Sequence, residues 1–127
     1  EILKYYDKTI ILDGSHNIDG AEKLSQFLKS KKIKPIVIFG MLKNKKIDVF
    51  LKIIKDQIKQ IIAIKIPNEE NAFNSKEIIK KCELLSIDYL KINNLKNIIK
   101  YVKKSNRGVY LITGSLYLVG KIRNNFL

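Results

Sequence analysis

The side chains in this sequence that can do chemistry gather in four short polar segments. They read DGSHNIDG at 13–20, GMLKNKK at 40–46, NEEN at 68–71 and TGSLY at 113–117. The first segment brings an acid, a histidine and an amide together on a turn that leads into a helical pattern. Because helix N-termini and nearby backbone N–H groups attract anions, a nucleotide or carboxylate ligand is physically reasonable there.

Each candidate residue has a binding role and a structural alternative. Asp13 can accept hydrogen bonds from ribose hydroxyls, His16 can contact phosphate or stack on a base, and Asn17 can fix the turn or donate to a substrate. Alternatively, Asp13 and Asn17 only cap the turn, and residue types alone do not choose between these roles. For Ser115, which follows Gly114, capping of the last helix is favoured over phosphate binding.

The pattern excludes several kinds of site. The sequence has a single histidine, so a metal site made of several histidines is excluded. Asp13, Ser15 and His16 stand too close together on one turn to form a hydrolase triad. No phosphate loop is present, because the Gly-Lys pair at 120–121 is followed by Ile122, and the three-glycine dinucleotide fingerprint is missing. We therefore expect no metal ligand and no complete ATP-hydrolysing or hydride-transferring apparatus.

Short apolar runs alternate with segments of helical spacing, which is typical of βα units around a parallel sheet. The predicted strands are 9–12, 35–39, 60–66, 87–90 and 109–113, with an edge strand expected at 1–6. Apolar residues at helical spacing predict helices over 18–28, 47–58, 78–85, 95–102 and 115–126. Ser75 and Asn94 are the predicted N-caps.

These elements predict an α/β, doubly wound fold in one domain. Crossovers between parallel strands are right-handed, so the carboxyl ends of the strands share one edge of the sheet, where ligands of open α/β folds bind. The four polar segments all follow predicted strands. We therefore expect them to meet at that edge.

Composition narrows the class of protein. With 46% hydrophobic residues, the chain can form a core of its own. Its net charge of +13 invites a nucleic-acid partner, but the charge comes from lysines spread along the chain, with only Arg107 and Arg123 as arginines. We favour a solvated basic surface and expect no nucleic-acid partner.

Cysteine usage and hydropathy bear on the compartment. Cys82 lies on the apolar face of a helical pattern, which predicts a core position. Because it is the only cysteine, no internal disulfide can form, which predicts a reducing, cytoplasmic compartment. No apolar run approaches the roughly 18 residues of a membrane span, and no signal peptide begins the chain. We expect no membrane partner.

Three of these segments, in order, resemble the signature motifs of the folylpolyglutamate synthases, relatives of the Mur ligases. ILDGSHNIDG at 11–20 is similar to Asp-Gly-Ala-His-Asn-Pro-x-Gly, and GMLKNKK at 40–46 is similar to Gly-x-x-x-Asp-Lys-Asp. ITGSLYLVG at 112–120 closely resembles the last motif of that family. The three matches span nearly the whole chain, which makes the resemblance specific.

The resemblance implies the C-terminal domain of a folylpolyglutamate synthase/dihydrofolate synthase, with residues 1–127 as one Mur-ligase-type domain. It implies a three-layer, Rossmann-like fold with a mostly parallel six-stranded sheet and helices on both faces. An N-terminal ATPase domain, absent from this chain, would carry the phosphate loop and hold Mg²⁺, so the isolated domain is expected to be inactive. The expected partners are that domain, folate or dihydropteroate, and L-glutamate, and a monomer is expected.

The implied reaction is an ATP-dependent ligation. ATP phosphorylates a folate carboxylate, and the amine of glutamate attacks the acyl phosphate. Carried over by position, Asp13, His16, Asn17 and Ser115 form the ATP-binding set, with Asn17 shaping the turn and Ser115 at the interdomain cleft. Lys45 faces the substrate side, and no residue of this chain is expected to be catalytic.

The sequence departs from the family pattern at four positions. Ser15 replaces alanine and Ile18 replaces proline, and both are tolerable in a turn. Asn44 and Lys46 replace the two acids that flank Lys45, which changes the local field. Alternatives are a degenerate, non-catalytic α/β ligand-binding module, a Mur-type ligase domain of other amino-acid specificity, and a nucleic-acid-associated domain.

Overall fold

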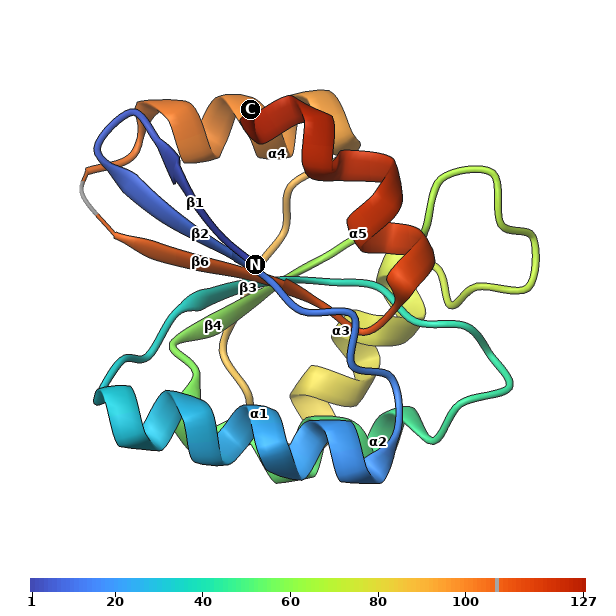
Figure 1. Cartoon of the computed structure of the whole chain (residues 1–127). Coiled ribbons are helices and arrows are strands. Elements are labelled where there is room, and N and C mark those ends of the chain that lie inside the picture. Colours follow the sequence, from blue (N-terminus) through green and yellow to red (C-terminus); the bar gives the residue numbers. More distant parts are fainter. Residues whose placement is uncertain (107) are drawn as a thin grey trace.

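A six-stranded sheet lies between two layers of helices in the computed structural model, which describes residues 1–106 and 108–127 (Figure 1). Arg107, one of the two arginines, lies outside the described residues. The strand order across the sheet is β1-β2-β6-β3-β4-β5. The strands are β1 (Ile2–Tyr5), β2 (Lys8–Leu12), β3 (Ile36–Phe39), β4 (Gln60–Ala63), β5 (Tyr89–Leu90) and β6 (Val109–Thr113).

The sheet is parallel except at one edge. β2, β6, β3, β4 and β5 pair in parallel, whereas β1 pairs antiparallel with β2. β6 is the last strand in the sequence but lies between β2 and β3, with Leu111 opposite both Ile11 and Val37. The expected mostly parallel α/β sheet and the edge strand at the start of the chain are therefore confirmed.

Helices cover both faces of the sheet, as expected. α1, α2 and α3 lie on one face, where Leu24, Phe50 and Ile78 join a single buried cluster (Figure 1). α4 and α5 lie on the other face, where Ile98 and Leu118 join a second cluster. The helices are α1 (Ile18–Lys31), α2 (Ile47–Ile54), α3 (Ser75–Leu84), α4 (Leu95–Lys104) and α5 (Leu116–Ile122), with 3-10 turns at η1 (Lys55–Gln57) and η2 (Arg123–Phe126).

Two predicted helix starts had different outcomes. Asn94 caps α4, as predicted, by accepting a hydrogen bond from the Asn97 backbone N–H at 3.0 Å. The prediction for α3 was wrong by one residue, because Ser75 is the first helical residue and Asn74 is the cap. Asn74 and Glu77 form a reciprocal capping box, which satisfies two backbone N–H groups at once.

Several boundaries are shorter than the sequence pattern predicts. β4 ends at Ala63, although Ile64 and Ile66 beyond it remain buried in the core. β5 keeps only two residues of its predicted run. Cys82 is fully buried, as predicted. In the part of the chain that the structure describes, none of the helices combines the length and apolarity that crossing a bilayer requires.

Candidate functional site

The carboxyl ends of β2, β6 and β3 lie side by side and bring three distant segments together. The segment after β2 begins at Asp13, the one after β6 at Gly114, and the one after β3 at Gly40. The Gly114 N–H donates to the Ser15 carbonyl at 3.1 Å, which joins the first segment to the last. The strand order therefore assembles the edge that the sequence analysis expected to hold a ligand.

The turn after β2 is held by its own polar side chains. Asp13 Oδ1 accepts from the Ser15 N–H at 2.8 Å, and Asn17 Oδ1 accepts from the Gly20 N–H at 2.8 Å as the N-cap of α1. Both residues thus do the capping work that was one of their two predicted roles. These bonds fix the backbone on either side of His16.

His16 is oriented by a hydrogen bond at the start of the turn. Its Nδ1 lies 3.0 Å from the Gly14 carbonyl oxygen. Because a carbonyl only accepts, Nδ1 must be the protonated nitrogen, and Nε2 of the neutral ring is then an acceptor. The side chain is half-buried. Because Nδ1 is already bonded, Nε2 is the ring nitrogen that remains for a ligand.

Ser115 caps α5 from a buried position. Its Oγ accepts from the Tyr117 N–H at 3.0 Å and from the Leu118 N–H at 3.4 Å. A serine hydroxyl also carries one donor hydrogen, and among the described residues no acceptor is paired with it. Capping, the favoured role, is therefore observed, and a donor remains for a ligand.

Gly114 makes the approach of β6 to β3 possible. Its φ of 109° lies in a region that side chains with a Cβ rarely adopt, and a Cβ there would collide with the Gly40 carbonyl oxygen. Glycine at this position lets two loop backbones touch where the strands end.

The loop that carries Lys45 is anchored to the segment that precedes α3. The Lys43 N–H donates to the Asn71 carbonyl at 2.8 Å, and the Phe73 N–H donates to the Met41 carbonyl at 3.0 Å. Lys45 itself is half-buried, and its ammonium pairs with no carboxylate within residues 1–106 and 108–127. It is a free cation at the sheet edge.

Two adjoining hollows lie over this edge. The first hollow, of about 400 Å³, is lined by the start of α1 and by the loop after β3. The second hollow, of about 420 Å³, is lined by the same loop and by the start of α5. His16, Asn44 and Lys45 line both hollows and form their shared wall.

The predicted site residues do not all reach these hollows. Asn17 lines the first, Ser115 lines the second, and His16 and Lys45 line both. Asp13 lines neither and instead supports the turn from beneath. Leu116 and Tyr117 line the second hollow with 66% and 57% of their surfaces exposed, and sequence reasoning did not single them out. Their apolar exposure beside a polar turn is visible only in the fold.

A metal site does not arise from these residues. In the described part of the chain, no group of three or more histidine, cysteine, aspartate or glutamate side chains is placed to hold an ion. Lys45 in the shared wall and the adjacent Lys46 in the first hollow are cations, and among the described residues Asp19, in the first hollow, is the one acid that lines either hollow. Such a wall suits an anionic ligand better than a metal ion.

The family model for the C-terminal domain of dihydrofolate synthetase matches residues 2–125. The chain belongs to this family. A dihydrofolate synthase/folylpolyglutamate synthase of Bacillus subtilis is 29% identical over 118 residues. That match covers 90% of this chain but 27% of the relative, so the family domain here spans about a quarter of its length.

Solved structures share the fold of this family domain. A folylpolyglutamate synthase of Thermotoga maritima superimposes with a TM-score of 0.83 and 24% identity, covering 99% of this chain and 29% of that one. A Mycobacterium tuberculosis folylpolyglutamate synthase, solved with ADP and AMPPCP, gives 0.78 and 19%, covering 99% and 31%. Both likenesses extend over the whole sheet and its two helix layers.

Proposed function

We propose that this chain is the C-terminal domain of an ATP-dependent ligase that adds L-glutamate to dihydropteroate or a folate. The observation that carries the proposal is the pair of adjoining hollows, where three family segments far apart in sequence place His16, Lys45 and Ser115 at one sheet edge. Family membership over residues 2–125 supports the same reaction class. An N-terminal ATPase domain would supply the phosphate loop and the magnesium ligands.

Ligands of the relatives support the choice of substrates. An Escherichia coli relative was solved with DHPP and ADP, and a bifunctional synthase was solved with Mn, AMPPNP and L-glutamate. The M. tuberculosis relative holds ADP and AMPPCP. In the proposal, ATP and a divalent ion act in the complete enzyme, and this domain contributes one wall of the cleft. Its lone buried cysteine favours a reducing, cytoplasmic compartment.

The proposed reaction has two steps. A carboxylate oxygen of the pteroate or folate attacks the γ-phosphorus of ATP, which yields ADP and an acyl phosphate. The glutamate amine then attacks the acyl carbon, the amide bond forms, inorganic phosphate leaves, and the nitrogen loses a proton. Exclusion of water matters because water would otherwise hydrolyse the acyl phosphate.

Five of the predicted site residues have a role in this proposal. Lys45, a cation without a carboxylate partner in the described structure, offsets negative charge on the substrate side. His16 Nε2 and the Ser115 hydroxyl hydrogen are directed to the nucleotide side. Asp13 and Asn17 act on the nucleotide through the turn that they hold. All five sit on backbone that the sheet makes rigid, which preserves their geometry.

The deciding experiment measures ADP release by the longer protein that contains this chain. Dihydropteroate or tetrahydrofolate and L-glutamate are added together and singly, and the 127-residue chain is assayed in parallel. We expect ADP only from the longer protein and only with both substrates. Absence of folate-dependent ADP release from a folded protein would instead favour a non-catalytic ligand-binding module, with Asn44 and Lys46 as the departures responsible.

A further inference from the structure

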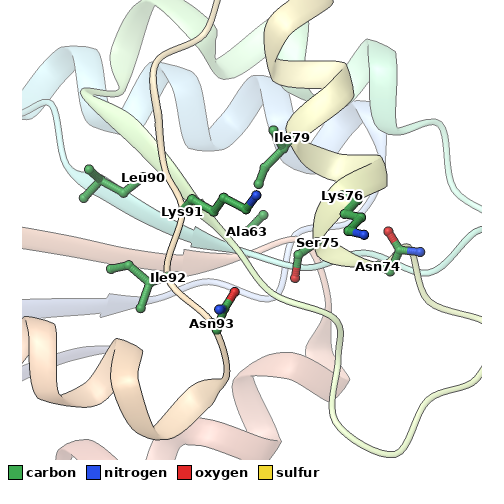
Figure 2. Close-up of a pocket in the computed structure, with 9 residues that line it drawn as sticks. All are labelled: Ala63, Asn74, Ser75, Lys76, Ile79, Leu90, Lys91, Ile92 and Asn93. Atoms are coloured by element: carbon green, nitrogen blue, oxygen red, sulfur yellow. The ribbon is translucent and has the colours of Figure 1, made fainter.

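A third hollow lies at the other end of the carboxyl edge, between the ends of β4 and β5 (Figure 2). Its volume is about 410 Å³, close to that of the hollows beside His16. Ala63 at the end of β4 lies at its base, α3 forms one side, and the segment after β5 forms the other. We call it the β4–β5 hollow.

The topology of the sheet explains why the chain opens here. β4 leads into α3, which lies on the face of α1 and α2, whereas β5 leads into α4 on the opposite face. The two connections therefore leave adjacent strands in opposite directions and leave a crevice between them, which is where open α/β sheets bind ligands. The same divergence separates β6 and β3, which lead to α5 and α2 on opposite faces, and the loop after β3 and the start of α5 line the second hollow.

The lining of the β4–β5 hollow combines apolar side chains and two lysines with the neutral polar residues Asn74, Ser75 and Asn93. Ile79 on α3, Leu90 at the end of β5 and Ile92 after it are partly buried against the core. Lys76 and Lys91 belong to opposite sides and are both exposed. Figure 2 shows the Lys91 side chain extending toward Ile79 and α3, with Lys76 at the start of that helix.

Some lysines near the hollow are paired with carboxylates, whereas Lys76 and Lys91, like Lys80, have no counter-ion among the described residues. Lys43 pairs with Glu77 at 3.9 Å and Lys81 pairs with Asp48 at 3.1 Å. Within the described residues no carboxylate pairs with Lys76 or Lys91, and no acidic residue lines the hollow. Two uncompensated ammonium groups thus face an apolar cavity from different elements.

The start of α3 is not what makes this hollow a candidate. Its capping box already occupies the Asn74 side chain and the Glu77 N–H. The ligand chemistry follows from the two lysines and the apolar walls. A cation pair selects a negative charge, and the isoleucine and leucine side chains select a hydrocarbon body.

We propose that the β4–β5 hollow binds a small organic anion. Its carboxylate lies between Lys76 and Lys91, and its apolar body packs against Ile79 and Ile92. The site is separate from the shared wall of the proposed ligase, because β3 and β4 stand between β6 and β5 in the sheet. The inference does not depend on the ligase reaction.

The test titrates sodium hexanoate into the protein and follows the methyl resonances of Ile79 and Ile92 by NMR. We expect saturable shifts at millimolar concentration that are confined to residues of the hollow. Hexan-1-ol, which lacks the charge, and inorganic phosphate, which lacks the apolar body, should bind more weakly at the same methyl groups.

Variants then separate a site from general surface charge. Lys76→Gln and Lys91→Gln should each weaken hexanoate binding about fivefold, the size expected for losing one partly solvated ion pair. Lys80→Gln removes an exposed charge from the same helix outside the hollow and should leave binding unchanged. Absence of saturable shifts, equal binding of hexan-1-ol, or an equal loss in Lys80→Gln would each overturn the proposal.

Discussion

Arg123 holds Glu1 through two hydrogen bonds, Nε to Oε1 and Nη2 to Oε2, each at 2.7 Å. The pair ties η2 to the beginning of β1. The Glu1 carbonyl also accepts from the Leu12 N–H at 2.8 Å, one residue before Asp13. The ion pair therefore braces the end of β2, from which the turn at His16 begins.

Replacing Arg123 with alanine should lower the melting temperature of the protein. Because its geometry is bidentate, this surface ion pair should contribute more to stability than a typical one, although salt still screens it. Thermal denaturation should show the gap from wild type shrinking in 1 M NaCl. Lys121→Ala, on the preceding turn, is the control and should show little change at either salt concentration.

The same pair has a defined pH dependence. The hydrogen bond from Arg123 holds the pKa of the Glu1 carboxyl below its ordinary value of 4.5. The stabilisation is therefore present above that value and is lost as pH falls through the lowered pKa. The difference in melting temperature between wild type and Arg123→Ala should narrow in acid, and a difference that widens would contradict this account.

Gly114→Ala should destabilise the fold by about 2 kcal/mol or more, because the residue combines a positive φ with a collision against Gly40. Gly120 is the matched control. It lies in α5, and a Cβ added there would meet no other atom within 4 Å. Gly120→Ala should therefore stabilise the folded protein by ~0.5–1 kcal/mol. Urea denaturation of both variants measures the contrast, and similar effects of the two changes would refute the role given to Gly114.

Cys82→Ser should cost ~1–3 kcal/mol of unfolding free energy, because it places a hydroxyl in a fully buried apolar site. Cys82→Ala removes volume without adding polarity and should cost less. Denaturant midpoints of the two variants decide the order. A serine variant as stable as the alanine variant would mean that the buried hydroxyl finds a partner.

Burial also raises the pKa of the Cys82 thiol to about 11 from an ordinary 9.0. The neutral thiol is thus favoured in the folded state, and its contribution to stability is full below pH 9 and lost as pH rises toward 11. The difference in unfolding free energy between wild type and Cys82→Ala should therefore shrink over this alkaline range. A thiol reagent at pH 8 should modify Cys82 only in denaturant, and rapid modification of the native protein would contradict the buried assignment.

His16→Ala in the longer protein should raise the KM for ATP about tenfold, the effect of losing one hydrogen bond to a charged ligand. The melting temperature should stay near that of wild type, because among the described residues the half-buried ring has a hydrogen bond only with the nearby Gly14 carbonyl. Steady-state ADP release gives the KM. An unchanged KM would remove His16 from the nucleotide site.

Sequence patterns predicted the elements of this fold well because burial leaves a local signature. The continuous apolar runs of β2, β3 and β6 mark strands covered on both faces. The carboxyl-edge rule then placed His16, Lys45 and Ser115 near one another before any contact was known. These predictions needed only local periodicity and the handedness of crossovers.

Other features depend on contacts that no local pattern encodes. The position of β6 between β2 and β3 is a choice among strand orders with equal periodicity. Tyr117 is exposed and Asp13 lies outside the hollows because of how the start of α5 packs over the turn that follows β2. The error at Ser75 arose because Asn74 and Ser75 are both good caps, and the reciprocal bond with Glu77 decides between them.

The central place of β6 also bears on how the protein is made. During synthesis, β2 and β3 leave the ribosome long before β6, yet β2 and β3 do not pair with each other. Until Val109–Thr113 emerges, the growing chain holds two half-sheets with open edges, which are templates for unwanted pairing. Insertion of β6 closes both edges and creates the ligand edge in one event, so the site exists only after this strand has been added.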